Sequence, residues 1–415
     1  MDSKGSLSSE AEPGKASLEE SRSIPTISPL SRGWAVLARG SELRGVAPIE
    51  VEERIAPRYW SNFTLWSVDS STTDSRSILT PTRDDCRYGM NATIACFATG
   101  TLAPLLFGLS FEASAYTIVG FNLFSCSIPS FIALFGPRLG LRTITVARYS
   151  FGYWFAIVPA ILNLASFIGF CVCPLVYCTA SRWTDHAAIA QAVNSIVGGQ
   201  TLAAINPGNI SVTVGIVIIA LCSLVISWTG YRMLHAFERY ACTFCPILSR
   251  TAADRVCSSG IPVTIAFIIL LGVSGSKLPS ALAFESVPTT AANVLSFASI
   301  VVGFSLSWAG CSADFNTYLP SDIPAGKLVA TTFLGLYLPS VGFQIVGAAF
   351  GAAALSGEIP SWSDAFATSS VGGLLGVALI EPLGGFGKFL LVILALGIIS
   401  QSFPPAHRSQ ADFNK

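Results

Sequence analysis

Long apolar runs separated by short polar segments dominate the chain from residue 91 onward. A helix that crosses a hydrocarbon core of roughly 30 Å needs about 20 mostly apolar residues. The runs of that length are 91–110, 114–135, 154–180, 210–228, 294–312, 328–355 and 386–404. An eighth run, 261–276, is shorter but still usable. The pattern therefore predicts an all-α, polytopic membrane protein with about eight spans.

The segment 371–385 is apolar but short. Glu381 and Pro382 interrupt it, and its glycine content is high for a stable spanning helix. Irregular backbone at membrane depth is tolerated where it is buried in protein. We therefore expect a re-entrant or external capping element that packs on other parts of the protein.

The composition agrees with a membrane protein. Hydrophobic residues make up 52% of the chain and charged residues 12%, whereas soluble chains carry roughly 25% charged residues. The 24 basic and 24 acidic residues balance to zero net charge, so nothing indicates a nucleic-acid partner. Residues 1–56, rich in Ser, Glu, Pro and Arg, are predicted to form a disordered cytoplasmic tail. Residues 57–404 would form the membrane domain and 405–415 a short C-terminal tail.

Basic residues between the predicted spans indicate the orientation of the chain in the lipid bilayer. They lie between spans two and three and between spans four and five: Arg138, Arg142, Arg148, Arg232, Arg239, Arg250 and Arg255. Both loops face the cytoplasm if the N-terminus is cytoplasmic, as the positive-inside rule requires.

The segment 303–320 is a candidate binding region. It is dense in Gly and Ser and contains Trp308 and an Asp-Phe-Asn sequence. Such a helix can unwind within the membrane and offer backbone groups and an aromatic plane to a polar ligand. Tight helix packing through small residues, with Trp308 as an interfacial anchor, explains the same composition. The sequence leaves both interpretations open.

Polar residues in apolar surroundings give a second set of candidates. Asn91 and Asn163 stand in or beside apolar runs, where a buried amide needs a hydrogen-bond partner. Bonds between helices would satisfy that need as well as a ligand would. The sequence contains no recognisable set of nucleophile and base, no phosphate loop and no metal-spaced His/Cys cluster. We therefore expect a protein that is not an enzyme and uses no metal and no cofactor.

Seven short motifs stand in order along the chain: Gly-Pro-Arg-Leu-Gly-Leu-Arg (136–142), Arg-Tyr-Ser-Phe-Gly-Tyr-Trp (148–154), Ile-Val-Gly-Gly-Gln-Thr-Leu (196–202), Glu-Arg-Tyr-Ala (238–241), Ala-Asp-Phe-Asn-Thr-Tyr-Leu-Pro (313–320), Ser-Val-Gly-Gly-Leu-Leu-Gly (370–376) and Pro-Leu-Gly-Gly-Phe-Gly-Lys-Phe (382–389). Together they resemble motifs of the fungal purine-cytosine permeases of the nucleobase:cation symporter-1 family. The likeness runs from about Arg58 to Ser400.

The resemblance implies a transporter of twelve helices with two inverted five-helix repeats, the LeuT-like arrangement. Its implied activity is uptake of cytosine, adenine, guanine and hypoxanthine across the plasma membrane by symport with a proton or cation. Transport of a related heterocycle, such as uracil, allantoin, a hydantoin or a vitamin-like pyridine, is the alternative within the class. A truncated remnant that does not transport is the alternative outside it.

Carried over residue by residue, the resemblance implies a substrate site on helices one, three, six and eight. Its candidate residues are Asn91, Asn194, Phe304, Ser305, Trp308 and Gln401, the last in place of a family Asn. Asp314 is the candidate coupling group, although a charged helix end is the simpler explanation for Asp314 and for Glu381.

Three polar segments depart from the family pattern, at about 67–89, 171–187 and 242–260, and each splits a predicted helix. A charged residue at the centre of a spanning helix costs about 2.5–3.5 kcal/mol. We therefore expect these insertions to lie outside the bilayer or to derive from retained introns. The family's helices nine to twelve have no counterpart in the chain, so the second repeat would be incomplete.

Overall fold

The structure is a computed structural model, and it describes residues 48, 91, 93–163, 186–206, 208–229, 260–284, 288–317 and 319–401. The predicted tails, apart from Pro48, and the predicted insertion 67–89 lie outside these residues, as do the other two insertions except for residues 186, 187 and 260. Residues 186 and 187 already belong to a helix, and residue 260 begins another.

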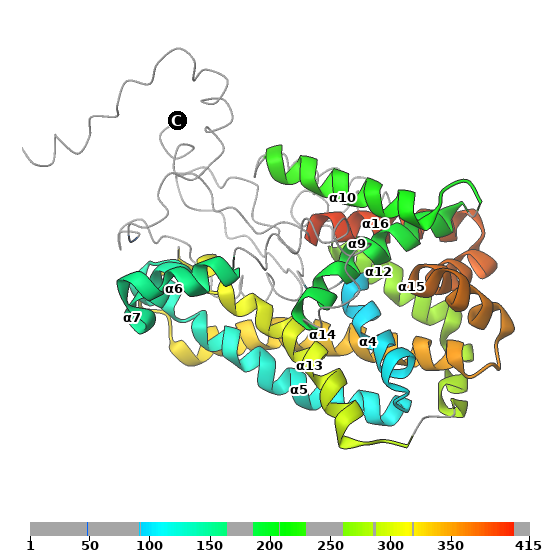
Figure 1. Ribbon diagram of the computed structural model, residues 1–415, viewed down its shortest axis with the longest axis horizontal. Helices are drawn as coiled ribbons and strands as arrows, with labels where there is room; N and C mark the ends of the chain where they lie inside the picture. Colours follow the sequence, from blue (N-terminus) through cyan, green and yellow to red (C-terminus); the bar gives the residue numbers. More distant parts are fainter. Residues whose placement is uncertain are drawn as a thin grey trace, which may run out of the picture. The chain divides into compact units, whose positions relative to one another are not determined.

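The described residues form helices and turns, without a β-strand among them (Figure 1). The helices are α4 (Ile94–Phe107), α5 (Phe111–Ile132), α6 (Phe135–Leu139), α7 (Thr143–Phe155), α9 (His186–Ile205), α10 (Val212–Thr229), α12 (Gly260–Ser274), η3 (Gly275–Ala283), α13 (Ala291–Leu306), η4 (Ser307–Gly310), η5 (Asp314–Asn316), α14 (Ala325–Leu355), α15 (Pro360–Leu383) and α16 (Gly385–Gln401). They all fall within Glu42–Lys415, which clusters as one unit.

Five of the described helical segments are long and apolar enough to cross a membrane: Phe111–Leu139, Val263–Ala281, Ala291–Gly310, Ala325–Leu355 and Pro360–Leu383. Shorter apolar helices lie at Ile94–Phe107, Ile196–Ile205, Val212–Cys222 and Gly385–Ile398. This confirms the predicted all-α, polytopic membrane protein. The third predicted run, 154–180, is described only as far as residue 163.

The prediction for 371–385 was wrong in one respect, because residues 371–383 are helical and belong to α15. The helix is broken at Ser369 and Ser370, and Ser370 has the left-handed φ of 53° that non-glycine residues rarely adopt. A Cβ at Gly372 would overlap the backbone of Gln200 in α9. The glycines therefore allow close packing of α15 on α9, so the expectation that this segment packs on protein is confirmed.

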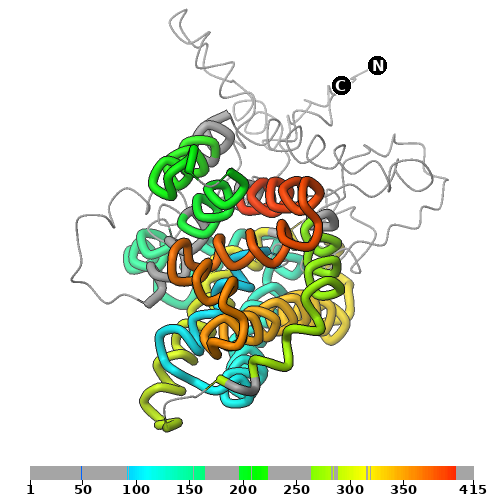
Figure 2. Tube along the Cα trace, turned by 90° about the vertical axis from the view of Figure 1, so that its right-hand side faces the viewer, coloured from blue at the N-terminus to red at the C-terminus, as the bar shows by residue number. Residues whose placement is uncertain are grey.

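Helix α14 packs along α4 and α5, and Figure 2 shows it beside both. A Cβ at Gly347 of α14 would overlap the carbonyl of Phe97, and a Cβ at Gly100 of α4 would overlap the carbonyl of Gln344. In lipid, helices associate through such close backbone approach, because apolar side chains gain little by leaving an apolar solvent. The α4–α14 crossing is therefore set by small residues.

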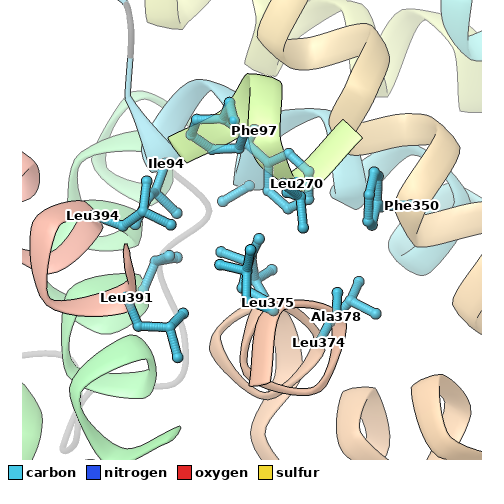
Figure 3. Packing of buried hydrophobic residues seen from close by; sticks show 14 of the residues in the cluster. Ile94, Phe97, Leu270, Phe350, Leu374, Leu375, Ala378, Leu391 and Leu394 are labelled. Carbon is cyan, nitrogen blue, oxygen red and sulfur yellow. The ribbon is translucent and has the colours of Figure 1, made fainter. Parts of the chain in front are cut away.

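A buried hydrophobic cluster joins α4, α12, α14, α15 and α16. Figure 3 shows Phe97, Leu270, Phe350, Leu375 and Leu391 converging from these five helices. The Phe97 ring lies 5.4 Å from that of Phe267 and 5.6 Å from that of Phe350, centroid to centroid. Aromatic contacts of this kind contribute about 0.5–1.5 kcal/mol each beyond area burial. This cluster holds α4 in place beside α14.

Candidate functional site

The end of α13 changes its helical form. Thr290 caps the start of α13 by accepting a hydrogen bond from the backbone N–H of Asn293, at 3.2 Å. Regular α-helix ends at Leu306, and the chain continues as the 3₁₀ turn η4, a further turn and the short η5. A 3₁₀ turn is common at the end of an α-helix. The α-helical form is therefore lost within the segment 303–320 that the sequence singled out.

Trp308, in η4, meets Asn91 just before α4. The Trp308 Nε1–H donates a hydrogen bond of 3.1 Å to Asn91 Oδ1. Asn91 is 1% exposed, and its Nδ2 has no hydrogen-bond partner in the described part of the chain. A buried amide donor of this kind costs about 1–3 kcal/mol while it is unsatisfied. The contact brings two sequence candidates together and leaves a donor for a further group.

Ser305 lies one turn before Trp308 and makes a different contact. Its hydroxyl donates to Asn122 Oδ1 of α5 at 2.8 Å. Asn122 Nδ2 in turn donates to Gln344 Oε1 of α14 at 2.7 Å and to the Ile118 carbonyl at 2.9 Å. All three polar side chains are at most 1% exposed. We name Ser305, Asn122 and Gln344 the amide network; it connects α13, α5 and α14.

Asp314 contacts the start of α7. Its carboxylate accepts a hydrogen bond of 2.6 Å from the Thr143 backbone N–H, and Thr143 Oγ1 accepts one of 3.1 Å from the Ala313 N–H. Negative charge at a helix N-terminus is stabilising. Burial raises the pKa of the Asp314 carboxyl above its usual range, while the bonds from Thr143 and the charge of Arg142 oppose that shift. Its contacts join the end of the α13 region to α7.

The remaining candidates are spread over several elements. Phe304 is half-buried on α13. Asn194 lies within α9 and Gln401 ends α16, but the structure does not describe either side chain. Asn163 Oδ1 lies against Gly310 of η4, where a Cβ would overlap it. Glu381 forms an exposed ion pair with Lys277, with 3.7 Å between its Oε2 and the lysine Nζ.

The structure reveals polar residues that the sequence reasoning missed. Asn122 and Gln344 lie in the middle of apolar helices and are fully buried. The cost of a buried amide, which singled out Asn91 and Asn163, applies to them equally. Among the described residues, no three His, Cys, Asp or Glu side chains come close enough to hold a metal ion.

Residues 88–398 match the family model described as "permease for cytosine/purines, uracil, thiamine, allantoin". The chain is 31% identical to the purine-cytosine permease fcyB of Emericella nidulans, over 76% of this chain and 54% of that protein. It is 27% identical to the purine-cytosine permease FCY21 of Saccharomyces cerevisiae, over 88% of this chain and 58% of that protein. It is also 29% identical to the vitamin B6 transporter TPN1 of Saccharomyces cerevisiae, over 72% of this chain and 46% of that protein.

No solved structure matches the chain significantly. The chain spans little more than half the length of the purine-cytosine permeases it matches. The matched residues nevertheless cover most of the helical region described above. The resemblance carried by the motifs is thus confirmed, and the chain belongs to this permease family, the nucleobase:cation symporter-1 family.

Proposed function

We propose that the chain is a nucleobase transporter, not an enzyme, and takes up purine bases and cytosine together with a proton or another cation. The observation that carries the proposal is the contact between Asn91 and Trp308, in which the buried Asn91 Nδ2 has no partner within the described residues. Support also comes from relatives that are named purine-cytosine permeases.

A nucleobase is a flat ring whose edge carries hydrogen-bond donors and acceptors. An aromatic face holds such a ring by stacking, and a carboxamide can bond its edge in a fixed orientation. The Asn91 oxygen is already engaged by Trp308, so its Nδ2 would donate to an acceptor on the base. A base bound there would satisfy a buried donor that is otherwise unpaired.

We propose Phe304, Ser305, Asn194 and Gln401 as further members of this site. Phe304 and Ser305 are included because they lie on α13 just before Trp308. Asn194 and Gln401 are included because of the resemblance to the family motifs. Asp314 is the proposed coupling group, because its half-buried carboxylate lies next to the segment that carries Trp308. The protein would act in the plasma membrane with a cytoplasmic N-terminus.

The test is uptake of radiolabelled cytosine and adenine in cells that lack their own nucleobase transport. The full chain should accumulate both bases, and Asn91→Leu should reduce uptake at least tenfold. Thr99→Val is the matched control, because Thr99 is buried in α4 and, among the described residues, its hydroxyl bonds only to the Ala95 carbonyl of the same helix, at 2.8 Å. Absence of uptake by a chain that reaches the membrane would overturn the proposal.

The relative named vitamin B6 transporter favours a second candidate, transport of a substituted pyridine. Pyridoxine, uracil, allantoin and a hydantoin are therefore included as competitors in the uptake assay. Competition by pyridoxine without competition by adenine or cytosine would favour this candidate over the first.

The split helices favour a third candidate, a remnant that does not transport. The three insertions carry charged residues that a spanning helix would not tolerate. Sequencing the mature transcript decides their origin. A transcript without these segments would identify them as retained introns and restore continuous helices, whereas a transcript that contains all three would contradict the intron hypothesis.

A further inference from the structure

We infer that Asn122 is a positioning residue that fixes the end of α13 and, through it, the orientation of Trp308. Asn122 does not belong to the proposed substrate site, but it donates or accepts three hydrogen bonds that reach α13, α14 and its own helix. The inference rests on the proposed function only where it concerns substrate selection.

The Ser305 hydroxyl makes an unusual choice of partner. A serine or threonine hydroxyl in a helix ordinarily bonds to the carbonyl three or four residues earlier. Neighbouring buried hydroxyls do so at 2.6–2.8 Å: Thr99 to Ala95, Thr117 to Ala113 and Ser130 to Cys126. Ser305 instead donates across to Asn122. Its hydrogen bond therefore links α13 to α5 and does not depend on the geometry of α13 alone.

The position of that bond along α13 matters. Ser305 is in the last α-helical turn, and η4 with Trp308 begins two residues later. Trp308 then reaches Asn91 through Nε1. The amide network therefore anchors the chain immediately before the segment that carries the proposed substrate contact, so a shift of Ser305 would move Trp308 relative to Asn91.

The chemistry of Asn122 suits this role. Its Nδ2 supplies two donors and its Oδ1 one acceptor, so a carboxamide is needed to satisfy Ser305, Gln344 and Ile118 together. On α14, Gln344 Nε2 and Ser340 Oγ are buried and have no hydrogen-bond partner among the described residues. Replacing Asn122 by an apolar side chain would leave Gln344 Oε1 unpaired as well, and Ser305 would return to a carbonyl of its own helix.

The experiment compares Asn122→Leu with Thr117→Val. Thr117 lies on the same helix, and its hydroxyl donates to the Ala113 carbonyl of α5 at 2.7 Å. The first measurement needs no substrate: N-ethylmaleimide labelling of Cys311 in membranes, quantified by mass spectrometry. Cys311 follows η4, is buried, and its thiol lies 3.6 Å from the Trp308 carbonyl. Asn122→Leu should raise its labelling rate about tenfold, with Cys96 of α4 unchanged and Thr117→Val like the wild type.

The second measurement is the KM for cytosine and adenine in a double-mutant cycle with Trp308→Phe. If Asn122 acts through Trp308, Asn122→Leu raises KM about tenfold, and little further effect appears when Trp308→Phe is already present. A role limited to stability would lower the maximal rate for both bases and leave KM unchanged. Ser305→Ala removes the same bond with a smaller change in volume and should raise the labelling of Cys311 as Asn122→Leu does.

The two measurements separate the inference from the proposed function. Unchanged Cys311 labelling in both Asn122→Leu and Ser305→Ala overturns the inference whatever the transport data show. Raised labelling without uptake by the wild-type chain overturns the proposed function and retains the positioning role. If labelling of Cys311 rises but the effects of Asn122→Leu and Trp308→Phe on KM are additive, Asn122 positions the end of α13 only. That result overturns its proposed effect on substrate selection.

Discussion

Helix α14 meets its neighbours in two contrasting ways. Toward α4 the contact is steric, because Gly347 lies against the Phe97 carbonyl and Gly100 against the Gln344 carbonyl. Toward α5 the contact includes a buried hydrogen bond, from Asn122 Nδ2 to Gln344 Oε1, and Asn122 in turn accepts a bond from Ser305 of α13. Gln344 takes part in both, with its backbone in the first contact and its side chain in the second.

The two contacts respond differently to movement. A backbone crossing through glycine has one well-packed arrangement, since a small displacement creates either a clash or a void. Hydrogen bonds between side chains can be exchanged for others, and Gln344 Nε2 is a donor that has no partner among the described residues. We therefore expect the α4–α14 crossing to act as a rigid frame and the amide network to set the position of α13 against it.

The largest effect is expected from Gly347→Leu. The new side chain would overlap the Phe97 backbone. Overpacking usually lowers the free energy of unfolding by at most about 3 kcal/mol, and the loss should be larger here because a backbone cannot rotate away as a side chain can. Gel filtration in detergent should show loss of the folded species. Gly342→Leu is the control, since Gly342 is exposed on the same helix and its Cβ would meet nothing within 4 Å. Similar yields from both variants would contradict the rigid crossing.

The next effect concerns the proposed substrate contact. Trp308→Ala should abolish saturable nucleobase uptake, because both the ring and the bond to Asn91 are lost. Trp308→Phe keeps a ring but removes Nε1, so KM should rise about tenfold, as expected for loss of one buried hydrogen bond of about 1–2 kcal/mol. Tyr337→Phe, which removes an exposed hydrogen bond to the Val119 carbonyl, is the control. Equal uptake by the Ala and Phe variants would show that the ring contributes nothing.

Asp314 should give a pH effect of intermediate size. Because burial raises its pKa in the folded protein, the protonated form is favoured on folding. Its contribution to stability is therefore present below the unfolded pKa of about 3.9 and is lost as pH rises through the raised folded pKa. The melting temperature of the wild type relative to Asp314→Asn should fall as pH rises above about 4 and become constant above the raised folded pKa.

A flat difference between these two proteins across that pH interval would contradict the shift at Asp314. Thr143→Val tests one of the contacts that oppose the shift, because the Thr143 side chain as well as its backbone N–H lowers the pKa of Asp314. This variant should keep the direction of the pH dependence and extend it to higher pH, because the pKa of Asp314 rises further.

The smallest effect is expected from Glu381→Gln. Glu381 and Lys277 are 47% and 42% exposed, and exposed ion pairs typically contribute at most about 1 kcal/mol. Lys277 also lies 5.5 Å from the centre of the Trp362 ring, a contact that remains in the variant. Thermal unfolding and nucleobase uptake should both stay close to wild type. A loss of proton-coupled uptake would make Glu381, and not Asp314, the coupling candidate.

Much of the helical layout follows from the sequence. The predicted run 328–355 corresponds to α14 at Ala325–Leu355, because an apolar stretch of that length has few alternatives in lipid. The prediction failed for 371–385, where the interruptions and the glycine content were taken to exclude a stable spanning helix. Gly372 instead lets α15 pack closely on Gln200 of α9. No local property of the segment indicates that α9 will lie beside it.

The candidate site was predicted in part. Asn91 and Trp308 were both named from the sequence, and the structure brings them into contact. The amide network was missed, although Asn122 and Gln344 are amides inside apolar runs. Membrane helices are apolar on all sides, so their hydrophobic pattern does not mark which face meets which partner.

The sequence by itself determined that the chain spans a membrane, where most helices lie and to which family it belongs, because hydropathy and short motifs are local properties. The tertiary structure alone decided that Asn122 bonds Gln344, 222 positions later, and that Ser305 bonds Asn122 and not its own helix. Such pairings depend on how closely helix backbones approach, which the glycines of α4 and α14 permit but do not specify until the helices are packed.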